Sequence, residues 1–147
     1  MPGILEYIKE NEHQLSEIVM NSISEYMYRN TRYDTDFSIV LIYSYNDIDI
    51  VALQKRLRLT DKIIELEENL YCVILDGAST ESCIKAAENV NFHLLELNAN
   101  NKYYLSAADS HMNNPKYINM IQSIFERLDF AIKNDLSNIV VHQDYVF

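Results

Sequence analysis

Hydrophobic residues in the first part of the chain recur every three or four positions, which is the spacing of one face of an α-helix. This apolar stripe runs from Ile4 to Tyr26, and most acidic residues of the segment lie off it. The pattern predicts one long or two abutting amphipathic helices over Ile4–Arg29, with a break at Asn11, followed by a polar linker over Asn30–Asp36. The stripe is expected to pack either on its own chain or on a second copy.

The middle of the chain alternates between apolar runs and a short helical pattern. Phe37–Tyr45 is nearly continuous in β-branched and aromatic residues, which predicts a central strand covered on both faces. A short helix is predicted over Ile48–Leu57, capped by Asn46 or Asp47. Two apolar runs then flank a polar tip at Glu67–Asn69, which predicts an antiparallel hairpin.

Further elements are predicted after the hairpin. They are a helix over Glu81–Asn91 capped by Ser79 or Thr80, strands at Phe92–Leu97 and Lys102–Ala107, a helix from Pro115 to about Lys133, and a strand at Ile139–His142. Helices interspersed with paired strands predict an α+β fold of the ferredoxin-like kind, with helices packed on a mostly antiparallel sheet.

Composition narrows the class of protein. A chain of 147 residues fits a helical extension over residues 1–33 and one domain over residues 34–147. A net charge of −10 disfavours binding to nucleic acids and to anionic membranes. No signal peptide and no apolar run of membrane-spanning length are visible, and Cys72 and Cys83 are expected to be reduced core residues. These features together predict a cytoplasmic protein.

The basic residues point to one place in this acidic chain. Four of the twelve, Lys55, Arg56, Arg58 and Lys62, lie close together just before or at the start of the hairpin. Such a local positive patch predicts an anion site and favours a binding module over an enzyme. The four histidines are scattered without a metal-ligand spacing, so no metal and no cofactor are expected.

The order of elements and the residues on it resemble a degenerate GGDEF domain, of the diguanylate cyclase family, over about Phe37–Val141. Members of that family carry Arg-x-x-Asp, a five-residue strand and then Gly-Gly-Asp/Glu-Glu-Phe at a hairpin tip. This chain has the same spacing, with Arg58-Leu-Thr-Asp61, then Lys62–Leu66, then Glu67, Glu68, Asn69, Leu70 and Tyr71. The resemblance implies a nucleotidyl-cyclase-like sheet.

The departures from the family pattern bear on catalysis. In the family, carboxylates of the first strand and of the hairpin hold two metal ions that activate a nucleoside triphosphate. Here Tyr43 and Tyr45 stand where the first strand usually carries aspartates, and Leu70 stands in place of the catalytic glutamate. Glu67 and Glu68 replace both glycines, which puts side chains where the nucleotide would lie. The resemblance therefore implies a domain without cyclase activity.

The Arg-x-x-Asp pair is the part of the family pattern that remains. In the family this pair is the inhibitory site that binds cyclic di-GMP. A guanidinium such as that of Arg58 can bind guanine or phosphate oxygens, and a carboxylate such as that of Asp61 can accept from guanine N–H groups. Lys55, Arg56 or Lys62 would add phosphate contacts. The first hypothesis is therefore an inactive signalling domain that is a cyclic di-GMP receptor.

Three other interpretations remain open from the sequence. One is an interaction module without a nucleotide ligand, which dimerises or binds another protein through residues 4–29. The second gives the pair a purely structural role, with Arg58 closing the helix before the hairpin and Asp61 starting the strand. The third is an active nucleotide cyclase with replaced ligands.

Overall fold

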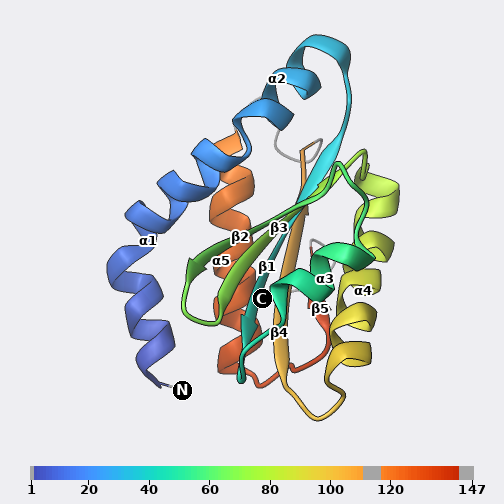
Figure 1. Ribbon diagram of the computed structural model, residues 1–147. Coiled ribbons are helices and arrows are strands. Elements are labelled where there is room, and N and C mark those ends of the chain that lie inside the picture. The colour runs from blue at the N-terminus through green and yellow to red at the C-terminus, as the bar shows by residue number, and fades with distance from the viewer. Residues whose placement is uncertain (1, 111–116, 143–147) are drawn as a thin grey trace.

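The computed structural model describes residues 2–110 and 117–142, which form a five-stranded sheet with helices on both faces (Figure 1). In chain order the elements are α1 (Pro2–Ser22), α2 (Ser24–Tyr33), β1 (Phe37–Ser44), α3 (Ile50–Arg56), β2 (Lys62–Glu67), β3 (Leu70–Asp76), α4 (Thr80–Leu97), β4 (Tyr103–Asp109), α5 (Tyr117–Lys133) and β5 (Val140–Val141). The strand order is β2-β3-β1-β4-β5, and every neighbouring pair is antiparallel except β4 and β5. None of the helices in this described part is long and apolar enough to cross a membrane.

The central strand β1 separates two hydrophobic cores. All eight of its residues are buried, which confirms the predicted central strand, although the strand ends at Ser44. Alternate side chains point to opposite faces, so Leu41 and Tyr43 pack with α1 and α5 while Val40 and Ile42 pack with α3 and α4. Figure 1 shows these two helix pairs on opposite sides of the sheet. The two faces therefore present separate environments for binding sites.

The predicted hairpin is confirmed. β2 and β3 pair antiparallel from Lys62 opposite Ile74 to Glu67 opposite Leu70, with a register shift between Glu65 and Glu67. Asn69 completes the tip with a φ of 63°, in the left-handed region that asparagine tolerates better than most residues. The backbone of this tip thus reverses without glycine.

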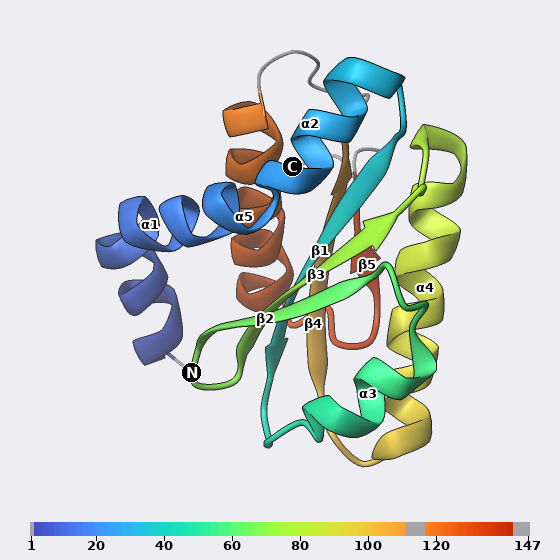
Figure 2. The same cartoon turned by 45° about the horizontal axis from the view of Figure 1, so that its top comes forward.

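The N-terminal helices pack on their own chain. Ile8, Leu15, Val19 and Ile23 are each at most 5% exposed and belong to the core that α5 and the sheet share. The sequence left open whether the apolar stripe packs on its own chain or on a second copy. Because these residues are buried in the core of their own chain, the stripe is not available to a second copy. In Figure 2, α2 lies at the end of the sheet where β1 begins.

The predicted break in the N-terminal helices was misplaced. The helix continues through Asn11, whose side chain donates to the Tyr7 carbonyl of the same helix at 2.9 Å. The helical segment is interrupted instead at Ile23, between the end of α1 and the start of α2. Hydroxyls on both sides of Ile23, those of Ser22 and Ser24, bond to preceding backbone carbonyls, an arrangement that often bends helices. The predicted linker was also too long, because α2 extends to Tyr33.

The strand predicted at Phe92–Leu97 was wrong, since α4 continues to Leu97. Cys83, Ala87, Val90 and Leu94 follow the helical period and are each at most 3% exposed, whereas Phe92 is 52% exposed. Burial of this stripe against the sheet outweighs the β-propensity of the local sequence. The helix begins as predicted with Ser79 as its cap.

Two other boundaries moved, and one prediction is not described. The cap of α3 is Asp49, which accepts from Ala52 N–H at 3.0 Å, rather than Asn46 or Asp47. The closing strand is confirmed but shorter, as β5 covers Val140–Val141 alone. Pro115, predicted to open the last long helix, lies outside the described residues.

Candidate ligand-binding site

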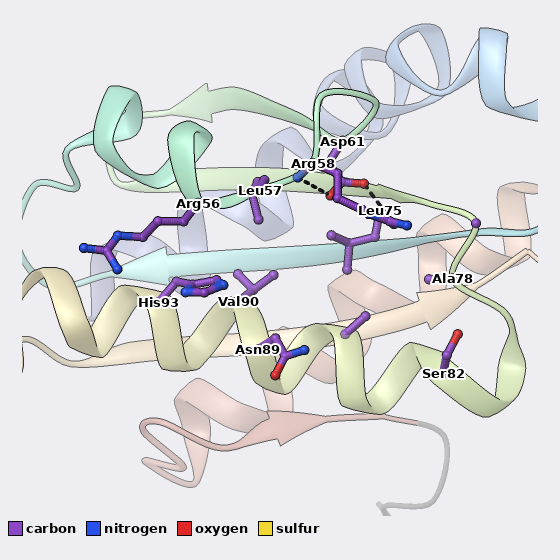
Figure 3. Close-up of a pocket in the computed structure, with 12 residues that line it drawn as sticks. Arg56, Leu57, Arg58, Asp61, Leu75, Ala78, Ser82, Asn89, Val90 and His93 are labelled. Atoms are coloured by element: carbon purple, nitrogen blue, oxygen red, sulfur yellow. Dashed lines mark hydrogen bonds and ion pairs between the residues drawn. The ribbon is translucent and has the colours of Figure 1, made fainter.

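Arg58 and Asp61 lie in the turn between α3 and β2 and contact each other directly (Figure 3). Asp61 Oδ2 accepts from the Arg58 backbone N–H at 3.0 Å and from Arg58 Nε at 3.3 Å. Asp61 Oδ1 accepts from Arg58 Nη2 at 3.2 Å, and the Asp61 N–H donates to the Arg58 carbonyl at 3.0 Å. The two residues therefore close the turn and fix the guanidinium group against the carboxylate.

Asp61 is held from β3 as well. Its Oδ1 also accepts from the Asp76 backbone N–H at 2.9 Å, and the residue is 7% exposed. Four donors thus fill the four lone-pair positions of the carboxylate, as a buried charge requires. The Tyr26 hydroxyl of α2 donates to the Thr60 carbonyl at 2.8 Å and anchors the same turn. The turn is consequently braced by β3 and by α2.

Arg58 is the exposed member of the pair. Its side chain is 62% exposed, against 4% for that of Asp61. Nε bonds to Asp61, and Nη2 bonds to Asp61 and to the Asp76 carbonyl. No partner is found for Nη1 among the described residues. Arg58 thus offers two N–H donors from a guanidinium whose orientation is already set.

Gly77 provides the backbone conformation next to this guanidinium. Its φ is 76°, in the left-handed region that favours glycine, and its N–H donates to the Asp36 carbonyl at 2.8 Å. A Cβ at this position would lie 3.9 Å from Arg58 Nη1, which is an ordinary contact distance. Glycine is therefore required here by the turn rather than by lack of space.

A cavity of about 300 Å³ opens beside Arg58, between the turn, the end of β3 and α4 (Figure 3). Its apolar side chains are those of Leu57, Leu75, Ala78, Ala86 and Val90. Its polar side chains are those of Arg56, Arg58, Asp61, Ser82, Asn89 and His93. The lining is thus divided about evenly between apolar and polar side chains, and its apolar part can contact a planar base while its polar part offers hydrogen-bonding groups.

Sequence reasoning found Arg56 but missed the contribution of α4. Glu96 Oε1 accepts from Arg56 Nη1 at 2.8 Å and lies 3.1 Å from His93 Nδ1, so it holds both side chains at one end of the cavity. Ser82 and Asn89 complete the polar lining from the same helix. No local signal in the sequence identifies Ser82, Asn89 and His93 as lining residues, because only the packing of α3 on α4 brings them to the turn.

The other two basic residues of the sequence cluster lie elsewhere. Ile63 packs with the core beneath α3 and α4, so its strand neighbours Lys62 and Ile64 face the opposite side of the sheet. Lys62 is exposed there and does not line the cavity. Lys55 lines a neighbouring cavity of about 620 Å³, which shares Arg58 with the first. The structure therefore brings Arg56 and Arg58 together and leaves Lys62 apart.

The hairpin tip is occupied by side chains and tied to α1. Glu67 and Glu68 are exposed, and Glu67 Oε2 accepts from the Tyr7 hydroxyl at 2.6 Å. This bond, followed by that from the Glu68 backbone N–H, lowers the pKa of the Glu67 carboxyl. Tyr71 is 4% exposed and packs on the α3 and α4 side. The tip thus presents two carboxylates and contacts the first helix.

Two of the positions where the family pattern has carboxylates, Tyr43 and Leu70, face each other as buried residues, whereas Tyr45 is 43% exposed. Tyr43 of β1 lies directly opposite Leu70 of β3, and they are 3% and 0% exposed. Neither side chain offers a carboxylate to a metal ion. Across residues 2–110 and 117–142, no group of three or more His, Cys, Asp or Glu side chains is placed to hold one.

The two cysteines are buried free thiols and not candidate nucleophiles. Burial raises the pKa of Cys72 to about 12 and that of Cys83 to about 11. Both therefore remain protonated near neutral pH, whereas a reactive cysteine needs its thiolate form.

Comparison with known proteins identifies the fold. No family model matches the chain, and no curated protein matches it in sequence. In structure it is similar to the GGDEF domain of TpbB (YfiN) from Pseudomonas aeruginosa, with a TM-score of 0.66 and 11% identity over 87% of this chain and 88% of that one. It is also similar to the active GGEEF domain of a diguanylate cyclase from Vibrio cholerae, with a TM-score of 0.62 and 15% identity over 82% and 90%.

A third similar structure contains a ligand. It is the GGDEF domain of DgcB from Caulobacter crescentus in complex with c-di-GMP, with a TM-score of 0.58 and 8% identity over 85% of each chain. At these identities the likeness establishes the fold alone. The chain has a GGDEF-like, nucleotidyl-cyclase-like fold, which confirms the fold class that the sequence predicted.

Proposed function

We propose that this chain is a GGDEF-like signalling domain without cyclase activity that binds cyclic di-GMP in the cavity beside Arg58. The observation that carries the proposal is the orientation of Arg58, which Asp61 and β3 hold at the edge of a 300 Å³ cavity with Nη1 unpartnered among the described residues. A fixed guanidinium loses little freedom when it binds a phosphate or guanine oxygen, so its contribution to affinity is large.

Each lining residue has a role in this proposal. Nη1 of Arg58 donates to guanine O6 or to a phosphate oxygen, and the apolar lining supports the base. Arg56 and His93, which Glu96 holds at one end of the cavity, are proposed to contact a phosphate group of the ligand. Asp61 acts as a positioning residue, since its carboxylate already accepts four internal bonds. Lys62 takes no part.

The proposed absence of cyclase activity rests on the positions of three side chains. Leu70 and Tyr43 are buried where the family pattern has carboxylates, and Glu68 places a negative charge at the hairpin tip. A nucleoside triphosphate needs metal ions to neutralise its charge, and this arrangement supplies carboxylate repulsion instead. Incubation of the full chain with GTP and Mg²⁺ is expected to yield no cyclic di-GMP, and catalytic turnover would contradict this part of the proposal.

Calorimetric titration tests the binding site. Cyclic di-GMP is expected to bind the wild-type chain saturably, and Arg58→Ala to weaken binding about tenfold or more, because a charge-assisted hydrogen bond is lost. Lys62→Ala is the matched control, since it also removes one exposed positive charge near the turn but on the opposite face. Equal affinities for all three proteins, or no binding to wild type, would remove the proposal.

The second candidate function is the docking of another protein or a second copy through residues 4–29. Because the inner stripe is buried, such a partner would have to use the outer surface, where Ile18 and Tyr28 are 40% and 57% exposed. Light scattering of the wild-type chain and of the double variant Ile18→Ser with Tyr28→Ser distinguishes the cases. A monomeric mass for both proteins would argue against self-association.

A further inference from the structure

A further cavity lies at the other end of β1, on the opposite face of the sheet from Arg58. Its volume is about 190 Å³, and three segments that are far apart in the sequence line it. The lining residues are Tyr43 and Tyr45 at and just beyond the end of β1, Lys102 and Tyr104 at the start of β4, and Ile132 and Asp135 at and just beyond the end of α5. This cavity is therefore independent of the proposed nucleotide site.

Tyr43 gives this cavity a hydroxyl group without a protein partner. The residue as a whole is 3% exposed, and its hydroxyl bonds to no residue that the structure describes and is not among the fully buried unpartnered side-chain atoms, so it opens into the cavity. A hydroxyl that opens into a cavity without a protein partner can donate to a bound group. Burial raises the pKa of Tyr43, so the hydroxyl stays protonated near neutral pH and can donate.

One positive and one negative side chain border the same cavity. Lys102 Nζ lies 5.7 Å from the centroid of the Tyr45 ring, over its face. Asp135 Oδ1 accepts from the Tyr104 hydroxyl, and its other oxygen has no hydrogen-bond partner within the described residues. The two charges do not pair with each other, since no ion pair joins Lys102 and Asp135.

We propose that this cavity binds a small zwitterion, specifically a free α-amino acid. The ammonium group of the ligand meets the open oxygen of Asp135. Its carboxylate meets Lys102 Nζ and the Tyr43 hydroxyl, and its side chain packs on the tyrosine rings and Ile132. The ligand thus bridges two opposite charges that the protein leaves apart.

Ligands with a single charge fit this arrangement less well. A simple cation would compete with Lys102, which already lies over the Tyr45 ring. A simple anion would meet the carboxylate of Asp135, which the Tyr104 bond holds at the cavity. A cavity of about 190 Å³ lies below the usual range of about 300–1,000 Å³ for drug-sized ligands, which favours a small molecule.

Calorimetric titration of the full chain with each of the twenty standard L-amino acids tests this proposal, with ethylamine and acetate as single-charge comparisons. At least one amino acid is expected to bind saturably, and ethylamine and acetate to bind at least tenfold more weakly. No saturable binding by any amino acid, or equal binding of a single-charge compound, would overturn the proposal.

The variants are chosen so that folding does not obscure the result. Tyr43→Phe removes a hydroxyl that bonds to no described residue, and Lys102→Gln changes an exposed side chain. Each is expected to lower the amino-acid affinity about tenfold with the wild-type melting temperature retained. Lys62→Gln is the control for Lys102→Gln, and Arg58→Ala separates this site from the nucleotide site; both should retain wild-type amino-acid binding. Wild-type affinity in both Tyr43→Phe and Lys102→Gln would overturn the proposal.

Discussion

The hydroxyl of Tyr7 on α1 donates a 2.6 Å hydrogen bond to Glu67 Oε2 at the tip of the β2–β3 hairpin. The two residues are 60 positions apart in the sequence, so this bond joins the N-terminal helix to the segment that carries the family pattern. Both groups in this bond are titratable, since the donor is the Tyr7 phenol and the acceptor is the Glu67 carboxylate. The strength of the bond therefore depends on pH.

Tyr7→Phe is expected to reduce the pH dependence of stability. The bond to Tyr7 lowers the pKa of Glu67, so its stabilisation is present above the ordinary carboxyl pKa of 4.5 and is lost as the pH falls through the lowered value. The bond to Glu67 raises the pKa of Tyr7, so the same stabilisation is lost as the pH rises past 10 through the raised value. Melting temperatures between pH 2 and pH 11 measure the effect.

The control for Tyr7→Phe is Tyr28→Phe, at an exposed tyrosine without a hydrogen bond in the described part of the chain. Between pH 7 and pH 3, the melting temperature should decrease more in the wild type and in Tyr28→Phe than in Tyr7→Phe. Identical losses in all three proteins would show that the bond does not contribute in solution.

Asp61→Asn is expected to destabilise the chain by about 1–3 kcal/mol, because one buried donor of Arg58 or Asp76 would then face an amide N–H instead of an oxygen. Cyclic di-GMP affinity should fall together with stability, since Arg58 would no longer be held. Urea unfolding and calorimetry measure the two effects.

Asp49→Asn is a matched control for Asp61→Asn. It makes the same chemical change at the cap of α3, where asparagine is as good a cap as aspartate. It should leave both stability and binding close to wild type. Loss of nucleotide binding in Asp61→Asn without any loss of stability would contradict the positioning role and would indicate direct contact with the ligand.

Leu94→Ala and Phe92→Ala are expected to differ because α4 is helical at both positions. Leu94 is 0% exposed, so its truncation leaves a cavity and costs about 2–5 kcal/mol. Phe92 is 52% exposed, and its truncation should cost less than about 1 kcal/mol. Chemical denaturation of the two variants provides the measurement, and equal destabilisation would argue against the helix.

Local patterns were sufficient where neighbouring residues decide the structure. β1 was predictable because every residue of Phe37–Ser44 is buried, and a strand covered on both faces is apolar throughout. The hairpin was predictable because its two strands are adjacent in sequence and separated by a polar tip. Arg58 and Asp61 were identified differently, through their resemblance to the Arg-x-x-Asp pair of the GGDEF family, and the structure shows that the two side chains bond.

Longer-range packing decided the features that the sequence left ambiguous. The apolar residues of Phe92–Leu97 fit either a strand or a helix, and burial of Leu94 against the sheet selected the helix. The partner of the N-terminal apolar stripe was also ambiguous, and burial of Leu15 and Val19 in the core that α5 shares selected the chain's own domain. These choices involve segments that meet only in the folded chain.

The sequence by itself determined the order of most elements and the α+β class, because each depends on residues a few positions apart. The Arg58–Asp61 pair was found through its resemblance to the Arg-x-x-Asp pattern of the GGDEF family. Tertiary structure alone decided that Asp61 also accepts a hydrogen bond from β3 and that α4 supplies His93 and Asn89 to the cavity beside Arg58. It likewise decided that Tyr43 lines a separate cavity on the opposite face of the sheet. The physical reason is that a binding site forms where segments that are distant in sequence pack together. The residues within each segment do not show which other segments it will meet.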